Sequence, residues 1–527
     1  MDFKDQMMNQ MKRILLITLV FYSVQVAGKD VVVTDYGAIP DGKTLNTEAL
    51  QKAIDACAQS GGGRVTVPVG TYLTGTIQLW DNIELHLAQN AILLGSTNNP
   101  ADYRDSALVL IKGVQNVAIS GSGIIDGQGW HQNFNNRGRK VKVSRPYEIF
   151  VRDSKFIKIT GIKLRNAPMW VVRLKKSEWI TIDNIHIYSH ANTNNDGIDI
   201  DAKNVVISNS IIDTDDDAIV FKSWTPGFVV ENVAISNCRI ASNCNAIKFG
   251  TWSAIGFRNI SIANCVITHA AEDNVRTPWH ERMEGITKQP TVISGIALEV
   301  VDGGFMDQVT ISNISMQGIQ TPIFIRLGDR DGIGSLKNVL ISKITATNES
   351  RITSSITGIP GSYVENVTIR DVIFNSKGTG TLEHTDKNVP ENNKGYPENR
   401  MYGASLPAHG FYVRHAKGIQ FENFRLLLRN PDARAAIVFD DVENSSLKNI
   451  QADTPTDDQP LFRIIQSKNI RFSGYHSTTP VNTLLSVEGG KTEKIIVDNC
   501  DLTGVKKVYQ TIDGARENEM IIKGNIE

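Results

Sequence analysis

Short runs of alternating apolar and polar residues recur along most of this 527-residue chain. A typical run is a polar residue, then Val or Ile, then any residue, then Ile, as at positions 204–207 and 232–235. Alternation of this kind places every second side chain on one face, which is typical of short β-strands. The runs are separated by Asn, Ser, Gly and Asp, which favour turns. The pattern therefore predicts many short strands and few helices.

The runs repeat at nearly constant spacing. From Ile157 to Ile260, their first apolar residues lie 23, 25, 28 and 27 positions apart. A strand-based period in the twenties indicates a stacked solenoid, because one unit cannot bury its own apolar face. The leucine frame of leucine-rich repeats is missing, so we predict an all-β fold, a right-handed parallel β-helix. Two longer steps, of 49 and 52 residues, begin at Ile260 and Val367, and we interpret each as about two units.

One helix is expected near the start of the repeats. Residues 46–48 (Asn-Thr-Glu) supply an N-cap and an acidic first turn, and the helix should run through Ala58. We expect it to cap the N-terminal end of the solenoid. Residues 29–527 then form a single domain, interrupted by insertions near 269–290 and 376–409. Long loops on a regular scaffold are more often lids or binding loops than simple connections.

Residues 1–28 have the order of a secretory signal peptide. Lys12 and Arg13 precede an apolar run at 14–26, which ends in small residues and is followed by polar ones. The run is too short to cross a bilayer, and no later segment is long and apolar enough to do so. We therefore expect an exported protein, periplasmic or secreted, with no membrane span.

Charge and cysteine content narrow the partners. The formal net charge is -1, whereas nucleic-acid-binding proteins usually carry a basic face, so no nucleic-acid partner is expected. Five cysteines, an odd number in a long chain, do not indicate a disulfide framework, and they lack metal-ligand spacing. Cys238 and Cys265 occupy equivalent places in neighbouring units, so we expect thiols in the core.

Two acidic clusters lie in neighbouring units. Asp196 opens one cluster, and Asp216 and Asp217 follow 20 residues later, close to one turn of the coil. The three carboxylates should therefore meet across adjacent rungs, about 4.8 Å apart. Repulsion between like charges would leave one acid protonated beside others that stay ionised, as glycoside hydrolysis requires. For any single Asp, a solvated turn or backbone capping is the simpler explanation.

The chain resembles family 28 of the glycoside hydrolases, the polygalacturonase-like, pectin-degrading enzymes. Residues 194–196 (Asn-Asn-Asp) match the family's Asn-Thr-Asp motif with a changed middle residue. Residues 215–223 match its Gly-Asp-Asp-Cys-Ile-Ala-Ile-Lys-Ser motif. The similarity covers most of the chain, including the segment 33–77, which is shared with other β-helix enzymes.

The resemblance implies an inverting mechanism. Asp216 would be the general acid on the glycosidic oxygen, and Asp196 with Asp217 would activate the attacking water. Inversion generally requires carboxyl groups about 6.5–9.5 Å apart, which leaves room for that water. We expect a poly- or oligosaccharide substrate, with no cofactor and no metal.

Two sites depart from the family pattern. Asn245 replaces the histidine of the family's Gly-His-Gly motif, and Ala297 and Glu299 stand where the family has the Arg and Lys of Arg-Ile-Lys. In members that cut polygalacturonate, that Arg and Lys grip the uronate carboxylate, which a Glu would repel. These changes weigh against ordinary polygalacturonase activity, and the released sugar could be a terminal galacturonic acid, rhamnose or another side-chain sugar.

Other residues could supply the missing positive charge. The candidates are Arg326, one or two rungs on, Arg276 and His280 in the first insertion, and Arg414 and His415. Each has the alternative role of a loop or surface ion pair. Four tryptophans lie near the acidic clusters in the sequence, and they either form a platform for a sugar ring or pack against loops: Trp170, Trp224, Trp252 and Trp279. The candidate substrate-binding residues are Asn194, Lys222, Asn245, Lys248, Glu299 and Arg326.

Three functions fit these features. The first is an exported inverting glycoside hydrolase, acting on chain ends if the insertions wall off one end of the groove. The second is a β-helix polysaccharide lyase or epimerase, in which the acids bind calcium and a basic residue removes a proton α to a carboxylate. The third is a non-catalytic carbohydrate-binding β-helix, consistent with the changed His and Arg-Lys positions.

Overall fold

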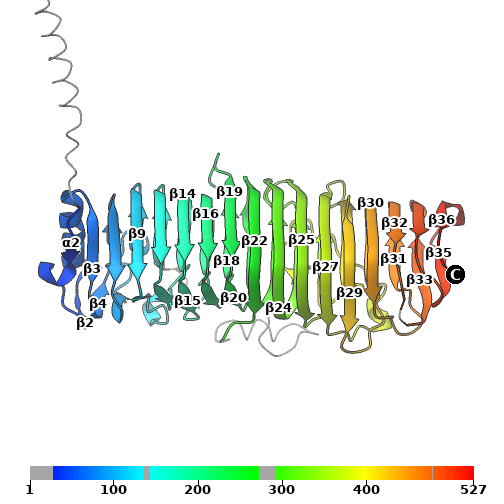
Figure 1. The fold of residues 1–527 in the computed structure, drawn as a ribbon, viewed down its shortest axis with the longest axis horizontal. Helices are drawn as coiled ribbons and strands as arrows, with labels where there is room; N and C mark the ends of the chain where they lie inside the picture. Colours follow the sequence, from blue (N-terminus) through cyan, green and yellow to red (C-terminus); the bar gives the residue numbers. More distant parts are fainter. Residues whose placement is uncertain (1–27, 136–142, 272–291, 478, 527) are drawn as a thin grey trace, which may run out of the picture.

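The computed structural model describes residues 28–135, 143–271, 292–477 and 479–526. The chain coils along one axis into an elongated solenoid, with its strands stacked side by side from the N-terminal to the C-terminal end (Figure 1). All 36 strands of the described residues belong to one hydrogen-bonded network, and consecutive coils pair in parallel. The predicted all-β, parallel β-helix fold is confirmed. The predicted signal segment lies outside the described residues, apart from Gly28.

Each full coil contributes to three faces, which we name the asparagine face, the second face and the site face. The asparagine face contains β1 (Val31–Val32), β3 (Gly63–Val67), β6 (Ile83–Leu87), β9 (Gln115–Gly121), β12 (Lys155–Thr160), β14 (Val172–Asp183), β16 (Ile198–Ser208), β19 (Val230–Ser236), β22 (Gly256–Thr268), β24 (Phe305–Leu327), β25 (Ser335–Asn348), β27 (Val364–Ser376), β29 (Gln420–Leu428), β30 (Ala435–Ala452), β32 (Lys468–Ser473), β34 (Glu493–Asp498) and β36 (Met520–Lys523). Several of these strands are long enough to bend onto a neighbouring face.

The second face contains β2 (Asp41–Leu45), β4 (Gly70–Thr74), β7 (Ala91–Gly95), β10 (Ile124–Asp126), β13 (Lys163–Arg165), β15 (His186–Ser189), β17 (Ile211–Thr214) and β20 (Arg239–Ser242). The site face contains β5 (Ile77–Leu79), β8 (Ala107–Lys112), β11 (Tyr147–Arg152), β18 (Ile219–Ser223), β21 (Asn245–Ser253), β23 (Val292–Val300), β26 (Ser354–Thr357), β28 (Ala408–Lys417), β31 (Phe462–Ile465), β33 (Val481–Glu488) and β35 (Val505–Ile512). The first residues of β14 and β16 also belong to the site face, since Val172 pairs with Ile198 and Ile198 with Ile219.

The repeat spacing sets the strand register. The first apolar residues of successive units pair with one another from Ile157 to Ile260, as predicted. However, Ile260 pairs directly with Val309, and Thr368 pairs directly with Gln420. Each longer step is therefore one coil enlarged by an insertion, and the interpretation as about two units is wrong. Loop length does not alter which strands stack, so spacing alone could not separate an extra coil from a long loop.

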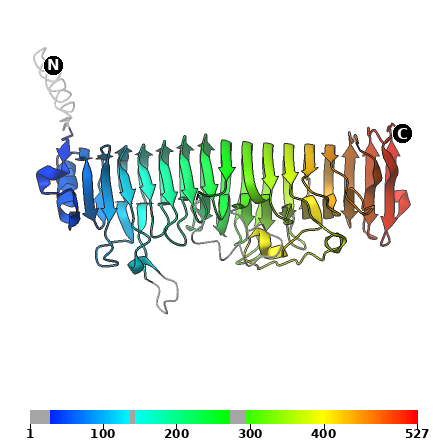
Figure 2. The same ribbon diagram turned by 90° about the horizontal axis from the view of Figure 1, so that it is seen from below.

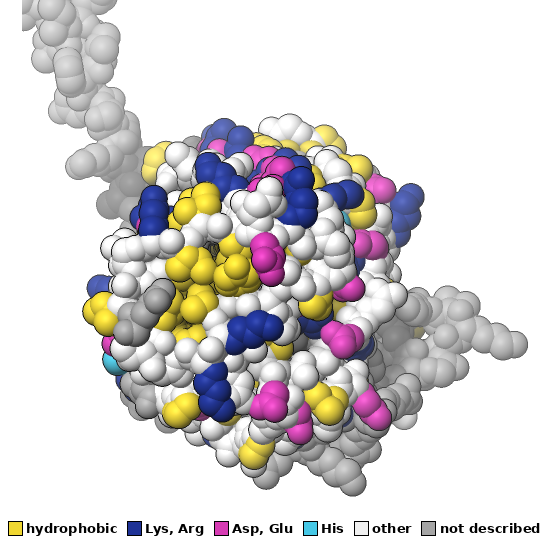
Figure 3. Space-filling model, turned by 90° about the vertical axis from the view of Figure 1, so that its right-hand side faces the viewer, with side chains coloured by type: hydrophobic (Ala, Val, Ile, Leu, Met, Phe, Trp, Pro, Cys, Tyr) yellow, Lys and Arg dark blue, Asp and Glu magenta, His cyan; other side chains and the backbone are white. Residues whose placement is uncertain are grey.

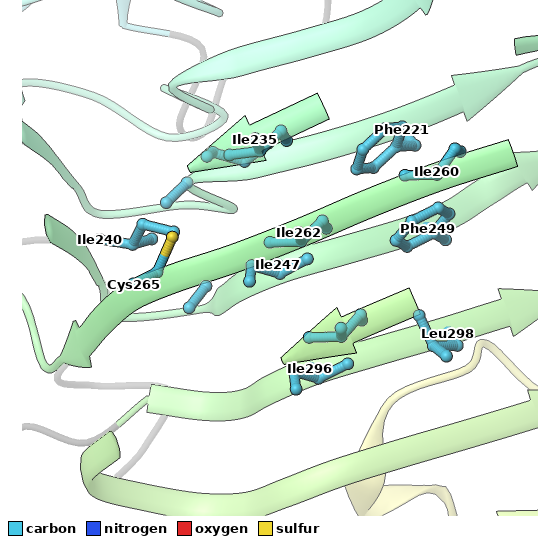
Figure 4. Packing of buried hydrophobic residues seen from close by; sticks show 14 of the residues in the cluster. Phe221, Ile235, Ile240, Ile247, Phe249, Ile260, Ile262, Cys265, Ile296 and Leu298 are labelled. Atoms are coloured by element: carbon cyan, nitrogen blue, oxygen red, sulfur yellow. The ribbon is translucent and has the colours of Figure 1, made fainter. Parts of the chain in front are cut away.

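Branched and aromatic side chains stack from coil to coil in the interior. Figure 4 shows Phe221, Phe249 and Leu298 on successive site-face strands. The rings of Phe221 and Phe249 are parallel within 10° and their centroids lie 4.1 Å apart. All five cysteines are buried and free, which confirms the prediction of core thiols.

Asparagines form ladders at the turn that leads into the asparagine face. The amide of Asn232 donates to the Asn204 side chain at 2.9 Å, and that of Asn259 donates to Asn232 at 2.7 Å. All three have φ between 54° and 59°, a left-handed conformation that Asn tolerates well. Phe156 and Trp179 occupy the same turn position in two earlier rungs, with φ of 57° and 60°. A residue with a Cβ pays about 1–2 kcal/mol for this conformation.

The predicted helix is present as α2 (Thr47–Gln59), at the N-terminal end of the solenoid in Figure 1. One side of it, including Leu50 and Ile54, is buried. Asn46 does not cap it through its side chain, which instead bonds to the backbone N–H and C=O of Ile39 at 2.6 and 3.0 Å. The capping of the solenoid by α2 stays a prediction. The short 3-10 helices are η1 (Val33–Tyr36), η2 (Gln132–Phe134), η3 (Leu382–His384), η4 (Asn399–Tyr402) and η5 (Glu517–Glu519).

The C-terminal end of the solenoid exposes apolar side chains, whereas α2 lies at the N-terminal end. At the C-terminal end, Ile521, Ile522 and Ile526 are exposed by 40%, 37% and 63%. Figure 3 views this end and shows apolar side chains gathered near its centre. No helix in the described parts of the chain is long and apolar enough to cross a membrane.

The loops gather along one side of the solenoid, as Figure 2 shows. The 376–409 insertion carries η3 and η4 and packs on the site face, where Tyr402 and Leu406 are buried with Phe324 and Tyr412. Most of the 269–290 insertion lies outside the described residues. The 376–409 insertion therefore contacts the site face.

Candidate active site

The coil brings the three predicted aspartates together on the site face. Asp196 and Asp217 each lie two residues before Ile198 and Ile219, which pair on adjacent strands. The N–H of Gly197 donates to the carbonyl of Asp217 at 2.9 Å. One carboxylate oxygen of Asp216 lies within 4.8 Å of one of Asp217. The aspartates therefore meet across neighbouring rungs, as the spacing predicted.

A bent connection between β17 and β18 holds Asp216 and Asp217. The hydroxyls of Thr214 and Ser242 donate to the carbonyl of Asp216 at 2.8 and 2.7 Å. The Asp216 N–H donates to the side-chain oxygen of Asn195 at 3.0 Å. Asn195 is the changed middle residue of the first motif, and its amide also ties this turn to the Ser189 carbonyl. The altered residue thus has a structural role that sequence comparison did not reveal.

All three carboxylates are buried, with residue exposures of 3% for Asp196, 7% for Asp216 and 4% for Asp217. This burial excludes the simpler explanation of a solvated acidic turn. Buried carboxylates require compensating partners, because an unpaired charge is costly away from water.

Asp217 has the strongest compensation. Burial acts to raise its pKa, but Lys248, Lys222 and the Asn245 amide outweigh burial and hold the pKa well below its usual range. Lys248 Nζ lies 3.3 Å from Asp217 Oδ2, and Asn245 Nδ2 donates to Asp217 Oδ1 at 2.7 Å. Asp217 is therefore a permanently ionised carboxylate near neutral pH.

Asp196 has the opposite environment. Burial, then the neighbouring Asp216 and Asp199, raise its pKa well above the usual range, against the attraction of Lys222. The pKa of Asp199 is raised to about 8 by burial, and neither of its oxygens has a hydrogen-bond partner among the described residues. The cluster therefore holds protons on some carboxyl groups beside the ionised Asp217.

Two buried lysines balance this cluster. Lys222 Nζ lies 3.9 Å from Asp196 and 3.9 Å from Asp199. Burial acts to lower the pKa of Lys222 and Lys248, but the neighbouring acids raise both above the usual lysine value. Both lysines therefore remain charged. Lys222 lies near Asp196 and the Trp170 ring, and Lys248 lies near Asp217 and the Tyr396 ring.

An aromatic wall borders the lysine and acid cluster. The Trp224 and Trp252 rings stack with centroids 4.4 Å apart and planes within 7°. Trp224 is 47% exposed, whereas Trp170 is only 8% exposed and meets Trp252 edge-on at 5.7 Å. Lys222 Nζ lies 5.5 Å from the Trp170 ring and 5.8 Å from the Trp252 ring. Trp224 has the exposure of a sugar platform, and Trp170 has the packing role; Trp279 lies outside the described residues.

Glu299 lies beside Lys248 and is 1% exposed, and neither of its oxygens has a hydrogen-bond partner in the described parts of the chain. Burial raises its pKa to about 8, despite the attraction of Lys248. Glu299 is therefore mostly neutral at pH 7. The repulsion of a uronate expected at this position requires an ionised Glu299, so burial removes most of it.

The 376–409 insertion brings Tyr396 to the site. The Tyr396 ring lies 5.5 Å from Lys248 Nζ and is 55% exposed, so it covers the lysine from the solvent side. Sequence analysis identified the insertion but not this residue. A tyrosine far along the chain carries no signal of contact with residue 248.

The other candidate cations hold the insertion in place. Arg326 is 1% exposed, and its guanidinium donates to the carbonyls of Gly358, Glu391 and Asn392 at 2.9, 3.0 and 3.2 Å. Arg414 and His415 both pair with Glu391, at 2.5 and 3.2 Å. These contacts favour the ion-pair and loop-anchoring alternative for all three residues. Arg276 and His280 lie outside the described residues.

Arg145 is a site residue that sequence analysis missed. It is 7% exposed and donates to Asn194 Oδ1 and to the Pro168 carbonyl, both at 3.0 Å. It also donates to the Thr193 carbonyl. Burial lowers its pKa, while Asp196 and Asp216 oppose that effect. Arg145 and the predicted Asn194 therefore fix the turn that carries Asp196, and a lone Arg before a strand gave no sign of this.

One grouping in the described residues brings three potential metal ligands close together. Ligand atoms of Asp216, Asp217 and Cys244 all lie within 4.8 Å of one another. Lys248 already compensates the Asp217 carboxylate at 3.3 Å. The negative charge that would attract a divalent cation is therefore partly matched by the protein's own cations.

Comparisons with known proteins agree with this arrangement. Residues 57–241 match the model of glycosyl hydrolases family 28. A probable polygalacturonase of Vitis vinifera is 32% identical over 234 residues, which cover 40% of this chain and 47% of that protein. An exo-poly-alpha-D-galacturonosidase of Dickeya chrysanthemi is 30% identical over 255 residues, covering 37% of this chain and 42% of that protein. The chain thus spans less than half the length of these two curated relatives.

The fold is also similar to that of a solved enzyme. A hyperthermoactive exopolygalacturonase from Thermotoga maritima superposes with a TM-score of 0.57 and 24% identity, covering 67% of this chain and 88% of that one. The family match includes all three aspartates but ends at residue 241, before Asn245, Lys248 and Glu299. Residues 57–241 are thus similar to family 28 of the glycosyl hydrolases, and the fold is similar to that of this exopolygalacturonase.

Proposed function

We propose that the protein is an exported glycoside hydrolase that cleaves pectin-type polysaccharide or its oligosaccharides by inversion, from chain ends. One observation carries this proposal: an ionised carboxylate, Asp217, lies beside the buried acids Asp196 and Asp216 on adjacent rungs. Hydrolysis of a glycosidic bond needs one carboxyl group that gives a proton and one carboxylate that assists the attack on carbon. The site supplies both forms at neutral pH.

In the proposed reaction, Asp216 gives its proton to the leaving glycosidic oxygen. Asp196 and Asp217 orient the attacking water and the ionised Asp217 accepts its proton, so that the water oxygen bonds to the anomeric carbon as the leaving oxygen departs. Two lysines compensate the negative charge of the cluster: Lys222 Nζ lies 3.9 Å from Asp196, and Lys248 Nζ lies 3.3 Å from Asp217. Asn245, in the place of the family histidine, positions Asp217 by a 2.7 Å hydrogen bond.

The stereochemical outcome needs a direct test. Oxygens of Asp216 and Asp217 approach within 4.8 Å. Inverting enzymes generally separate the two carboxyl groups by about 6.5–9.5 Å, and retaining enzymes by about 5–5.5 Å. The proposal of inversion therefore rests on the resemblance and on Asp196 as a water ligand, not on the Asp216–Asp217 separation.

The surroundings favour a uronate-containing substrate. Lys248 lies beside an exposed Tyr396, and the pKa of about 8 for Glu299 leaves that neighbour mostly uncharged at pH 7. An uncharged Glu299 does not repel a uronate carboxylate as an ionised one would. The polygalacturonase and exo-poly-alpha-D-galacturonosidase named among the relatives are consistent with such a sugar.

Action on chain ends is supported by the 376–409 insertion. It packs on the site face through Tyr402 and Leu406 and brings Tyr396 over Lys248. A loop at this place would limit how far a polymer can extend past Lys248 along the site face. Export is supported by the signal-like order of residues 12–28.

Product analysis by NMR tests the proposal. A panel of pectic polymers and oligosaccharides is incubated with the protein, and the released sugar and its first-formed anomer are recorded. We expect an inverted monosaccharide that Asp216→Asn fails to release, while Asp30→Asn, far from the site in the chain, serves as a matched control. Absence of any released sugar from the whole panel would reject the proposed function.

The same samples separate the two alternatives. A lyase would form an unsaturated product with new ultraviolet absorbance and would lose activity with a calcium chelator. A non-catalytic binding protein would bind a pectic polymer equally well with and without Asp216→Asn and would release nothing.

A further inference from the structure

A shallow groove crosses the asparagine face, on a different face of the coil from the aspartates. It has a volume of about 660 Å³. Its floor is a column of residues in register, one from each of five successive strands: Lys158, Thr181, Val206, Ala234 and Ser261. Five strands span four intervals, or about 19 Å along the solenoid. Since most of these side chains are short, an extended chain could lie along the floor.

Two aromatic residues line one end of this groove. Phe156 and Trp179 are 53% and 52% exposed, and their rings lie 6.3 Å apart with planes within 17°. Both occupy the left-handed turn position that asparagine fills in the neighbouring rungs, a conformation unfavourable for bulky residues. Backbone preference therefore favours Asn here, and burial does not explain aromatic rings that stay half exposed. Such strained positions cluster at functional sites.

The rest of the same wall is an amide ladder. Asn204, Asn232 and Asn259 line the groove beyond the aromatic pair. Asn232 donates one N–H to Asn204 and accepts one from Asn259. A side-chain amide has two N–H groups and two acceptor positions, so Asn232 keeps one of each for a ligand. The three asparagines lie on successive rungs, about 4.8 Å apart, and suit a ligand that repeats as well.

The charge of the groove selects among such ligands. Its lining residues, all of them described, include the cation Lys158 and no Asp or Glu. Lys158 lies in the floor at the aromatic end, two residues from Phe156, and its side chain is exposed. An anionic group on the ligand would therefore meet a cation there, and would meet no repelling carboxylate along the groove.

We propose that this groove binds an extended segment of an acidic, uronate-containing polysaccharide, whether or not the aspartates hydrolyse it. Sugar rings pack on Phe156 and Trp179, the ladder amides bond to hydroxyl groups, and Lys158 pairs with a carboxylate. Aromatic faces that combine apolar area with adjacent polar groups are well suited to sugars. The groove would hold a long polymer on the protein while the site face acts on another part of it.

The test uses the full chain with Asp216→Asn, so that no substrate is consumed, and polygalacturonate as the probe. Hydrogen exchange followed by mass spectrometry locates the bound polymer. We expect slower exchange in residues 155–160 and 176–183, in addition to any change on the site face. Adding Phe156→Asn and Trp179→Asn, which extend the asparagine ladder, should abolish that protection and leave the melting temperature no lower. Lys158→Gln should weaken it at least threefold.

Several results would overturn this proposal. Polygalacturonate could fail to protect these residues, or could protect them equally in the Phe156→Asn, Trp179→Asn variant. A lower melting temperature in that variant would mean that the aromatic pair only stabilises the fold. Concentration-dependent dimerisation that the variant abolishes would instead make the groove an interface between two copies. Because exchange is measured without turnover, protection here is independent of whether the parent protein hydrolyses any pectic substrate.

Discussion

The site face and the asparagine face are built from the same coils but differ in the charge, burial and repetition of their polar side chains. β16 contributes to both: Asp199 and Asp201 at its start are buried among charges, whereas Asn204 and Val206 near its end line an exposed groove. On the asparagine face, the amides of Asn204, Asn232 and Asn259 bond to one another from rung to rung. On the site face, six buried acids (Asp196, Asp199, Asp201, Asp216, Asp217 and Glu299) occur within a few rungs, beside Lys222 and Lys248.

The difference shows how a solenoid can accommodate polar groups in two ways. A repeated polar ladder satisfies each group locally and is stable without distant help. The acids of the site face instead depend on Lys248, Arg145 and a loop from residues 376–409, which come from separate parts of the chain. Substitutions on the site face should therefore have large, pH-dependent effects, and those on the asparagine face small and local ones.

The largest effect is expected on catalysis. Asp216→Asn removes the proton donor of the proposed reaction, and general acid catalysis contributes about 10²–10⁴-fold to rate. We expect a loss of that size in kcat with little change in melting temperature, since the amide preserves the shape of the carboxyl group. Rates of sugar release by the variant and the parent measure it. Full activity in Asp216→Asn would remove this residue from the mechanism.

The next effect is on stability. Lys248→Met removes the nearest cation from the buried Asp217, and breaking a buried pair in this way costs about 3–5 kcal/mol. Because the pKa of Asp217 is depressed, its stabilising contribution exists above the ordinary Asp pKa and is lost as pH falls through the folded value. Denaturant unfolding should show a large deficit at pH 7 that shrinks at low pH. The matched control, Lys248→Met with Asp217→Asn, should recover much of it.

Glu299 should show the opposite pH dependence. Its folded pKa of about 8 lies above the ordinary value of 4.5, so the unfolded chain releases this proton first and stability falls as pH rises between these values. Glu299→Gln replaces the carboxyl group by an amide that does not titrate in this range. Its melting temperature should match the parent near pH 4 and exceed it by a few degrees at pH 8. Equal pH profiles for parent and variant would show that Glu299 is ionised in the folded protein.

A smaller effect is expected at Tyr396. The ring covers Lys248 at 5.5 Å, and cation–π contacts of this kind contribute about 0.5–2 kcal/mol. Tyr396→Ala should therefore lower the free energy of unfolding by about 0.5–2 kcal/mol and, because the loop then no longer covers Lys248, raise KM for a pectic oligosaccharide. Tyr396→Phe keeps the ring and serves as the control, with KM near that of the parent. An unchanged KM in Tyr396→Ala would place the insertion away from the substrate.

The smallest effect is expected on the asparagine face. Asn232→Gly removes the ladder amide but permits the positive φ of 59°, and should cost about 0.5–1.5 kcal/mol. Asn232→Ala adds the left-handed strain of a Cβ, about 1–2 kcal/mol more. Both variants should release sugar at the parent rate. A strong loss of activity in Asn232→Gly would break the separation between the two faces.

Local pattern determined most of the fold. The alternation and the steps of 23 to 28 residues encode strands and their stacking, because each coil must bury its apolar residues against the next. The same spacing predicted that Asp196 would meet Asp216 and Asp217. It could not distinguish an extra coil from an insertion, since a loop leaves the register of the flanking strands unchanged, as the direct pairing of Ile260 with Val309 shows.

The chemical state of the site was decided only by tertiary structure. Nothing near Glu299 in the sequence indicates a pKa of about 8, which follows from complete burial beside Lys248 and Asp217. Nothing local assigns Arg326 to loop carbonyls or brings Tyr396 to Lys248. Burial and long-range contacts are properties of the folded chain. The sequence by itself therefore determined which acids meet, and the tertiary structure determined which of them are charged and what covers them.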